Sequence, residues 1–145
     1  MNRNNFDTEW TPISQAVAEL ASTPATREVW LIGSRANGSA NETSDWDLMV
    51  FSDEEPAPVA PRRELIDVLH VGPSGHVLLE GKPKEFTLQL RDFQWSVLAE
   101  RQASYLGKKP VKLDDGVSRD YAAPRFIRSK LHALLIWCRA ACNQG

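Results

Sequence analysis

Residues 33–47 read Gly-Ser-Arg-Ala-Asn-Gly-Ser-Ala-Asn-Glu-Thr-Ser-Asp-Trp-Asp, a glycine-serine turn followed at short distance by two aspartates one residue apart. The apolar run Val-Trp-Leu-Ile at residues 29–32 precedes the turn, and Leu-Met-Val-Phe at residues 48–51 follows the second aspartate. Short apolar runs bounded by turn residues predict buried strands. The stretch therefore predicts a strand, a turn, a polar loop and a second strand, and the rest of the fold is built around them.

Both ends of this stretch carry groups that suit a nucleoside triphosphate. Residues two apart on a strand lie on the same face, so Asp45 and Asp47 point the same way and can hold one divalent cation between them. Gly33 lets a backbone come close to a phosphate, and Ser34 offers a hydroxyl and an amide at the start of an expected helical turn. A phosphate site and a cation site so close together predict the binding of a nucleoside triphosphate.

The length and composition are those of one ordinary soluble domain. The chain has 145 residues, of which 42% are hydrophobic and 25% charged, and its formal net charge is -2. This length suffices for one core, so we expect a single domain over residues 1–145. Because acidic and basic residues are interspersed, binding to bulk nucleic acid through a broad basic surface is not expected.

The sequence also bears on the compartment in which the protein works. The chain begins without an apolar stretch of signal-peptide length, and no segment approaches the roughly 20 apolar residues that a membrane span needs. We therefore expect a cytoplasmic protein with no membrane partner. The two cysteines, Cys138 and Cys142, lie one helical turn apart, a spacing that suits neither a disulfide within a regular helix nor a four-ligand zinc site. Two reduced thiols are expected.

Apolar spacing predicts the elements outside the motif. A threonine-proline pair at residues 11–12 predicts the start of a first helix. Alternation predicts a half-buried strand over residues 86–90. Helical spacing predicts helices over residues 94–106 and about 124–142. Residues 62–71 suit a helix or a strand, and periodicity does not decide between the two.

The spacing within the motif resembles that of the nucleotidyltransferase superfamily that includes DNA polymerase β, in its small prokaryotic form. In that family a hydrophobic strand ends in Gly-Ser, and an Asp-x-Asp flanked by apolar residues follows a short distance later. Here ten residues separate Ser34 from Asp45, and the resemblance is close over residues 27–52. It implies an α/β (α+β) fold with a small mixed β-sheet and helices packed mainly on one face. The motif core then covers residues 27–71.

The resemblance implies metal-dependent transfer of a nucleoside monophosphate from a triphosphate, with ATP expected, to a hydroxyl acceptor. Pyrophosphate would leave. Mg²⁺ or Mn²⁺ would be held by Asp45, Asp47 and a third carboxylate, as in two-metal phosphoryl transfer. Gly33, Ser34 and the backbone amides around them would bind the phosphates. Arg35 is a further candidate phosphate contact, with a solubilising surface charge as its alternative role.

The family's third carboxylate lies on a neighbouring strand and helps the acceptor to lose its proton. Asp67 is the first candidate for this catalytic and metal-binding role, because it stands within the apolar pattern Leu-Ile-Asp-Val-Leu of residues 65–69. If residues 62–70 formed a helix, Asp67 would instead be a solvated surface residue. Glu85, at the start of the expected strand over residues 86–90, is the rival candidate. A chain without a third carboxylate is the last alternative.

Two classes of function stay open on the sequence. An active transferase could modify a small hydroxyl compound, as antibiotic-modifying adenylyltransferases do, or a hydroxyl on a partner protein, as small nucleotidyltransferase antitoxins do with their toxins. The short chain favours a partner protein or a homo-oligomer, because one domain leaves little surface to enclose a small acceptor. The alternative is a non-catalytic, nucleotide-binding or antitoxin-like regulatory module with the same fold.

Overall fold

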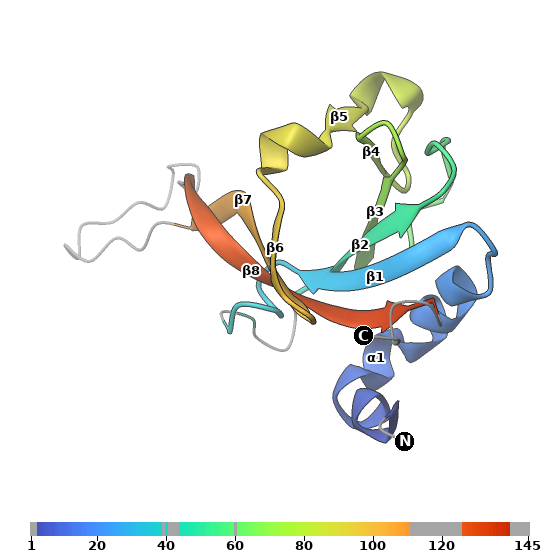
Figure 1. Cartoon of the computed structure of the whole chain (residues 1–145), viewed down its shortest axis with the longest axis vertical. Coiled ribbons are helices and arrows are strands. Elements are labelled where there is room, and N and C mark those ends of the chain that lie inside the picture. The colour runs from blue at the N-terminus through green and yellow to red at the C-terminus, as the bar shows by residue number, and fades with distance from the viewer. Residues whose placement is uncertain (1–2, 39, 41–43, 60, 111–125, 140–145) are drawn as a thin grey trace.

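One helix precedes a curled, eight-stranded mixed sheet in the computed structural model of the chain, which describes residues 3–38, 40, 44–59, 61–110 and 126–139 (Figure 1). Within this part of the chain the α-helix is α1 (Arg3–Ala21). The strands are β1 (Thr26–Ile32), β2 (Trp46–Ser52), β3 (Ile66–Val71), β4 (His76–Leu79), β5 (Leu88–Gln89), β6 (Ser96–Ala99), β7 (Gln102–Pro110) and β8 (Phe126–Cys138), with short 3-10 helices η1 (Lys84–Phe86) and η2 (Leu90–Phe93) beside β5.

The strand order brings the ends of the motif together. Across the sheet the order is β5-β4-β3-β2-β1-β8-β7-β6. The pair β2–β3 is parallel, and the other neighbouring pairs are antiparallel. Ile32 at the end of β1 lies opposite Asp47 near the start of β2, and Asp47 lies opposite Asp67 near the start of β3. The glycine-serine turn and these two aspartates therefore share one end of the sheet.

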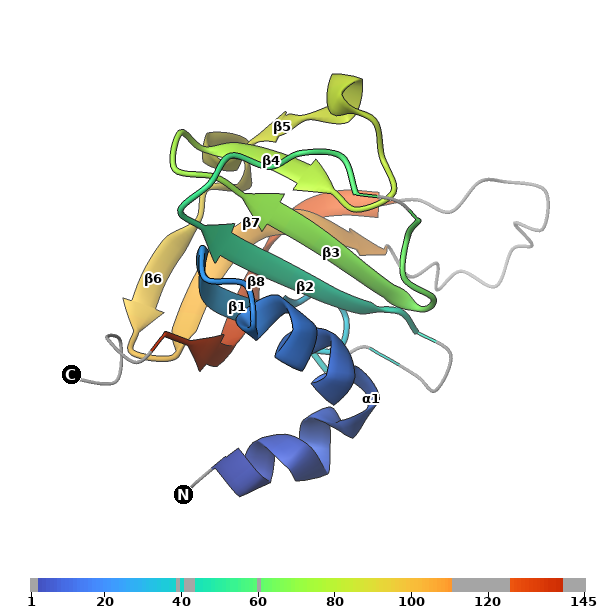
Figure 2. The same ribbon diagram turned by 90° about the vertical axis from the view of Figure 1, so that its right-hand side faces the viewer.

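The central strands bury both of their faces, which explains their continuous apolar sequence. One face packs under α1, which lies across the sheet in Figure 2. The opposite, concave face holds a second cluster of buried side chains. The α1-side cluster contains Ile13, Val17, Leu20, Val29, Leu31, Leu48, Val50, Val68 and Ile136. The concave-face cluster contains Trp30, Ile32, Met49, Phe51, Val71, Val77, Ala103, Tyr105, Ala133 and Leu135.

The C-terminal helix expected over about residues 124–142 was wrong, because residues 126–138 form the long strand β8. Leu135 and Ile136 are both buried, the first in the concave-face cluster and the second under α1. A strand that is buried on both faces lacks the alternation of a half-buried strand, and its apolar run can match helical spacing.

The helix expected over residues 94–106 was also wrong, since this segment contains β6 and the first half of β7. The fold class must be corrected accordingly. The mixed sheet is present, but it has eight strands, and the described residues contribute one α-helix to its face instead of several helices. The chain is thus richer in strands than its apolar spacing predicted.

At the level of single elements, two further expectations changed and one open choice was settled. The first helix begins at Arg3, and Pro12 lies inside it although proline is more common in the first turn. Residues 66–71 form strand β3, which settles the choice left open for that segment. The strand expected over residues 86–90 is reduced to the two residues of β5, between η1 and η2.

Cys138 is disulfide-bonded, so the expectation of reduced thiols was wrong for this residue. The expectation depended on helical spacing, whereas Cys138 ends strand β8. Cys142 lies outside the described residues. None of the described residues belong to a helix with the length and apolar character that crossing a membrane requires.

Candidate active site

The turn after β1 begins at Gly33. Only glycine can occupy this position, for two reasons. Its backbone has a φ of +76°, in the left-handed region where other residues are strained. A Cβ at this position would also overlap the carboxylate of Asp47. Gly33 therefore makes room for the carboxylate of Asp47, and the phosphate contact expected of it stays a prediction. Ser34 follows, partly buried, and its carbonyl accepts a hydrogen bond from the amide of Asn37 at 3.2 Å.

Three aspartates converge beside this turn. Asp45 immediately precedes β2, while Asp47 and Asp67 lie in register on the parallel strands β2 and β3. Burial, then the negative charges of Asp67 and Asp45, raise the pKa of Asp47 to about 7, and the charge of Arg62 only partly offsets them. A hydrogen bond between the carboxyls of Asp47 and Asp67 contributes in the same direction. Burial is the largest cause of the rise in this pKa, and repulsion by the neighbouring carboxylates adds to it.

Arg62 is the cation that faces this cluster. Its Nη2 lies 3.1 Å from Oδ2 of Asp45, and its Nε lies 2.5 Å from Oδ1 of Asp67. Hydrogen bonding and attraction to Asp67, helped by Asp45 and Asp47, raise the pKa of the guanidinium above its ordinary value. One side chain therefore bridges two of the three aspartates.

The three aspartates suit a divalent cation in their chemistry. Carboxylate oxygens are the ligands that Mg²⁺ and Mn²⁺ prefer, and the repulsion that raises the pKa of Asp47 is what a bound cation would relieve. Among the described residues, however, no three acidic, histidine or cysteine side chains are already arranged to hold a metal ion. With Arg62 between Asp45 and Asp67, coordination by all three requires the guanidinium to withdraw.

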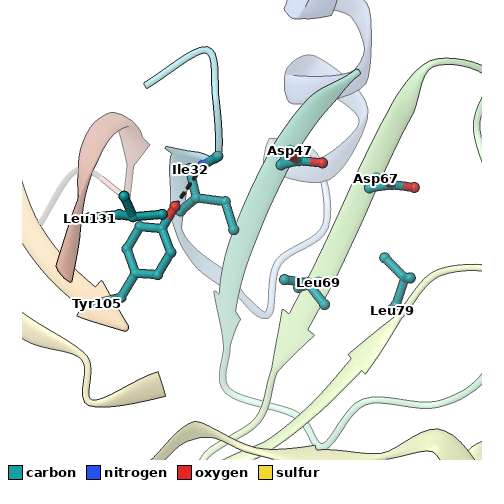
Figure 3. A pocket seen from close by; sticks show the side chains of 8 residues that line it. Ile32, Asp47, Asp67, Leu69, Leu79, Tyr105 and Leu131 are labelled. Carbon is teal, nitrogen blue, oxygen red and sulfur yellow. Dashed lines mark hydrogen bonds between the residues drawn. The ribbon is translucent and has the colours of Figure 1, made fainter. Parts of the chain in front are cut away.

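A cavity of about 280 Å³ opens beside Asp47 and Asp67 on the concave side of the sheet (Figure 3). The aspartates line its upper part in the view of Figure 3, and the hydroxyl of Tyr105 lies across from them. The remaining lining is mostly aliphatic and comes from Ile32, Gly33, Leu69, Leu79 and Leu131. The site thus combines a polar rim with a small apolar pocket.

In a comparison with known protein families, residues 13–134 match the nucleotidyltransferase domain. The chain belongs to the nucleotidyltransferase domain family. The matched stretch covers most of the chain, including the turn, all three aspartates and most of the C-terminal strands. No curated protein and no solved structure matches the chain.

The turn of this nucleotidyltransferase domain is fastened to β8 by one amide side chain. Nδ2 of Asn37 donates hydrogen bonds to the carbonyls of Gly33, at 2.8 Å, and His132, at 3.0 Å. Oδ1 of Asn37 accepts the amide of His132 at 2.8 Å. Through these bonds Asn37 shapes the turn and pairs with the backbone of β8 as a neighbouring strand would.

Tyr105 on β7 fastens the same turn from the concave side. Its hydroxyl oxygen accepts the amide of Gly33 at 2.7 Å, the bond drawn as a dashed line in Figure 3. Burial raises the pKa of Tyr105 above its ordinary value, so the hydroxyl keeps its proton near neutral pH. The sequence did not indicate Tyr105, because it lies 72 positions from Gly33 and in a segment expected to be a helix.

Arg35, a candidate phosphate contact, has structural partners in this nucleotidyltransferase domain. Its Nη2 donates a hydrogen bond to the carbonyl of Ser44 at 2.8 Å, and its guanidinium lies 4.2 Å from the ring centre of Trp46. These contacts tie the turn to the residues on either side of Asp45. A phosphate contact by Arg35 stays a prediction.

The rival third carboxylate, Glu85, is exposed on η1, whereas Asp67 is placed beside Asp47. Arg62 was not among the residues that the sequence indicated for the site. The sequence alone shows only that Arg62 lies five residues before Asp67. The two side chains can be placed together only once the turn between them is known.

Proposed function

We propose that this chain is a metal-dependent nucleotidyltransferase that moves a nucleoside monophosphate from ATP to a hydroxyl acceptor. The observation that supports it best is the register that sets Asp67 opposite Asp47, with Gly33 packed against the carboxylate of Asp47. Three carboxylates next to a turn that opens with Gly33 and Ser34 form the minimal set for this chemistry.

In the proposed reaction, Asp45, Asp47 and Asp67 hold Mg²⁺ or Mn²⁺. A cation bound there would supply activation of the attacking oxygen and would neutralise charge on the leaving group. Ser34 and the amides of the turn bind the terminal phosphates. The acceptor oxygen forms a bond to the α-phosphorus while the bond from that phosphorus to the bridging oxygen breaks, and pyrophosphate leaves with that oxygen. Asp67 takes the acceptor's proton.

The pocket supports an acceptor hydroxyl that is presented by a larger partner, such as a partner protein. Its volume of about 280 Å³ lies just below the range of about 300–1,000 Å³ that is typical of small-molecule sites. Its aliphatic lining offers few hydrogen-bond groups to a compound with many hydroxyls. A single side chain inserted from a partner protein, as in a toxin–antitoxin pair, fits both features better than a free polyhydroxyl compound does.

The test is transfer of label from ATP, measured separately for the α- and γ-phosphates. With Mg²⁺ or Mn²⁺ and a mixture of proteins or small hydroxyl compounds as acceptors, we expect label to be transferred from α-labelled ATP and not from γ-labelled ATP. Asp47→Asn and Asp67→Asn should each abolish transfer, because a neutral amide cannot replace a carboxylate at a cation site. Glu85→Gln is the matched control and should leave transfer unchanged.

Two outcomes contradict this proposal. Transfer from the γ-labelled nucleotide would indicate a phosphotransferase. Transfer that survives Asp67→Asn and disappears with Glu85→Gln would show that the third carboxylate was assigned to the wrong residue.

A regulatory module that binds nucleotide without turnover is the second candidate. The bridge that Arg62 makes between Asp45 and Asp67 favours it, since a permanent bridge would keep these carboxylates from a cation. This candidate predicts ATP binding with no labelled product under any of the conditions above. Loss of binding in Asp47→Asn together with measurable transfer by the unmodified chain would exclude it.

A further inference from the structure

The guanidinium of Arg62 takes the place among the carboxylates that a cation would need. It contacts Asp45 at 3.1 Å and Asp67 at 2.5 Å, and the described residues hold no preformed three-ligand cluster. We propose that Arg62 is the built-in counter-ion of this cluster and sets the cation affinity of the site, because a divalent cation must displace it. This inference rests on the proposed cation site, not on nucleotide transfer.

The backbone around Arg62 is held firmly. Arg63 forms a β-bridge with Ile66, and Leu65 between them has a φ of +63°, so the chain reverses tightly before β3. This reversal brings Arg62 beside Asp67. On its other side, the backbone and Cβ of Arg62 pack against Gly81, where a side chain would clash.

The neighbouring residue anchors this segment further. The side chain of Glu80 is only 3% exposed, and Nε of Arg63 lies 2.9 Å from its carboxylate. Nη1 of Arg63 also reaches Glu19 on α1 at 2.7 Å. Burial alone would raise the pKa of Glu80, but its hydrogen bonds with His70 and Arg63 outweigh burial and lower it. The side chain of Arg63 therefore holds the backbone in place, while the side chain of the adjacent Arg62 contacts Asp45 and Asp67.

The Arg62 guanidinium is free to leave without moving this anchor. The side chains of Arg62 and Asp45 are each 43% exposed, so water can replace the ion pair as it opens. Partly exposed ion pairs are weak, because water screens the charges and replaces each contact as it opens. Two such contacts lower cation affinity by a factor on the order of ten, which a divalent cation with carboxylate ligands can overcome.

The experiment is Mn²⁺ titration of the full chain, stripped of metal and without nucleotide, followed by calorimetry and by the electron paramagnetic resonance of free Mn²⁺. Arg62→Gln should bind Mn²⁺ about tenfold more tightly than the unmodified chain. Arg27→Gln is the matched control, because it removes the same charge from a partly exposed ion pair with Asp53 at the opposite end of β1. Its Mn²⁺ affinity should not change.

A second readout separates the proposed role from a general loss of structure. Without metal, Arg62→Gln should melt at a lower temperature than the unmodified chain, and Mn²⁺ should raise its melting temperature by more. Arg62→Lys keeps one positive charge but cannot bridge two carboxylates in the same way, so its Mn²⁺ affinity should be intermediate. This variant keeps the inference testable if Arg62→Gln fails to fold.

Unchanged or weaker Mn²⁺ binding in Arg62→Gln and Arg62→Lys would overturn the inference, as would no binding by any of the variants. The inference and the proposed function can fail separately. Tighter Mn²⁺ binding in Arg62→Gln without any nucleotide transfer would support the inference and contradict the function. Transfer by the unmodified chain with equal Mn²⁺ affinity in Arg62→Gln would do the reverse.

Discussion

In the folded chain, burial and the negative charges of Asp67 and Asp45 raise the pKa of the Asp47 carboxyl from 3.8 to about 7. The folded chain therefore holds this proton more tightly than the unfolded chain does. The contribution of Asp47 to the free energy of unfolding is fully present below about pH 4 and is lost as the pH rises through about 7. Above that pH and without a cation, the folded chain carries a negative charge on Asp47 that burial and the neighbouring carboxylates disfavour.

Asp47→Asn should accordingly stabilise the metal-free protein at high pH. The neutral amide avoids the repulsion, so the gain in the free energy of unfolding should grow by roughly 2 kcal/mol between pH 5 and pH 8. Urea unfolding in the presence of a chelator measures it. Asp53→Asn is the control: Asp53 pairs with Arg27 and Arg139, and its loss should bring no gain. A gain for Asp47→Asn that does not vary with pH would contradict the raised pKa.

Tyr105 allows a test of the turn at the level of a single oxygen atom. Tyr105→Phe removes the acceptor of the Gly33 amide and leaves the ring in place. We expect a loss of about 1 kcal/mol in the free energy of unfolding and a several-fold weaker Kd for ATP, because the turn is less well held. Equilibrium binding of ATP and urea unfolding measure the two effects.

Ser104→Ala serves as the control for Tyr105→Phe. Ser104 is buried on the same strand, and its side chain faces the other side of the sheet from Tyr105. Its loss should affect stability and not ATP binding. An unchanged ATP Kd in Tyr105→Phe would show that the turn does not depend on the tyrosine hydroxyl.

At the scale of elements, the contact between the turn and β8 depends on Asn37. Asn37→Ala removes the two hydrogen bonds with His132 that join the turn to the strand. We expect the amide of His132 to exchange with deuterium much faster, because it loses its acceptor. Amides of the central pair β1–β2 should keep their protection. Equal exchange at His132 in the variant and the unmodified chain would mean that the strand position does not depend on the turn.

The elements that could be predicted are those whose sequence pattern is complete within a short stretch of the chain. The strands β1 and β2 and the placement of Asp47 beside Gly33 follow from a pattern spanning about twenty residues. β3 was one of two alternatives, and its pairing with β2 decided between them. Burial on both faces gave β8 an apolar pattern that also fits a helix, and strand pairing overrode that spacing.

The parts of the site that could not be predicted depend on contacts between distant elements. Tyr105 reaches Gly33 only because β7 and β8 extend the sheet beyond β1. Arg62 reaches Asp45 only through the tight reversal at Leu65, whose left-handed backbone no pattern in an apolar run indicates. The motif and the apolar pattern around Asp67 indicated the aspartates that the structure brings together, but not the arginine that contacts them or the tyrosine that holds the turn.

At the scale of the whole molecule, the concave face of the sheet is closed by aromatic packing. Trp95, between η2 and β6, lies with its ring centre 5.1 Å from that of Trp30 and 5.1 Å from that of Phe51. It also stacks on Tyr105 at 6.3 Å. The segment from β5 to β6 thus crosses the open side of the curled sheet in Figure 1, and the C-terminal half of the chain completes the core of the N-terminal half.

The motif core should therefore not fold without the C-terminal strands. A fragment of residues 1–82 keeps α1 and β1 to β4, but β1 loses its pairing with β8, and the concave-face cluster loses Tyr105 and Leu135. We expect this fragment to show no cooperative urea transition by circular dichroism. The part of the core that remains in it buries too little apolar surface to offset the conformational entropy lost on folding. Adding the complementary fragment of residues 83–145 should restore the transition, since the two halves bury each other's apolar faces. A fragment of residues 1–82 that unfolds cooperatively alone would instead make the C-terminal strands an addition to a core that is already complete.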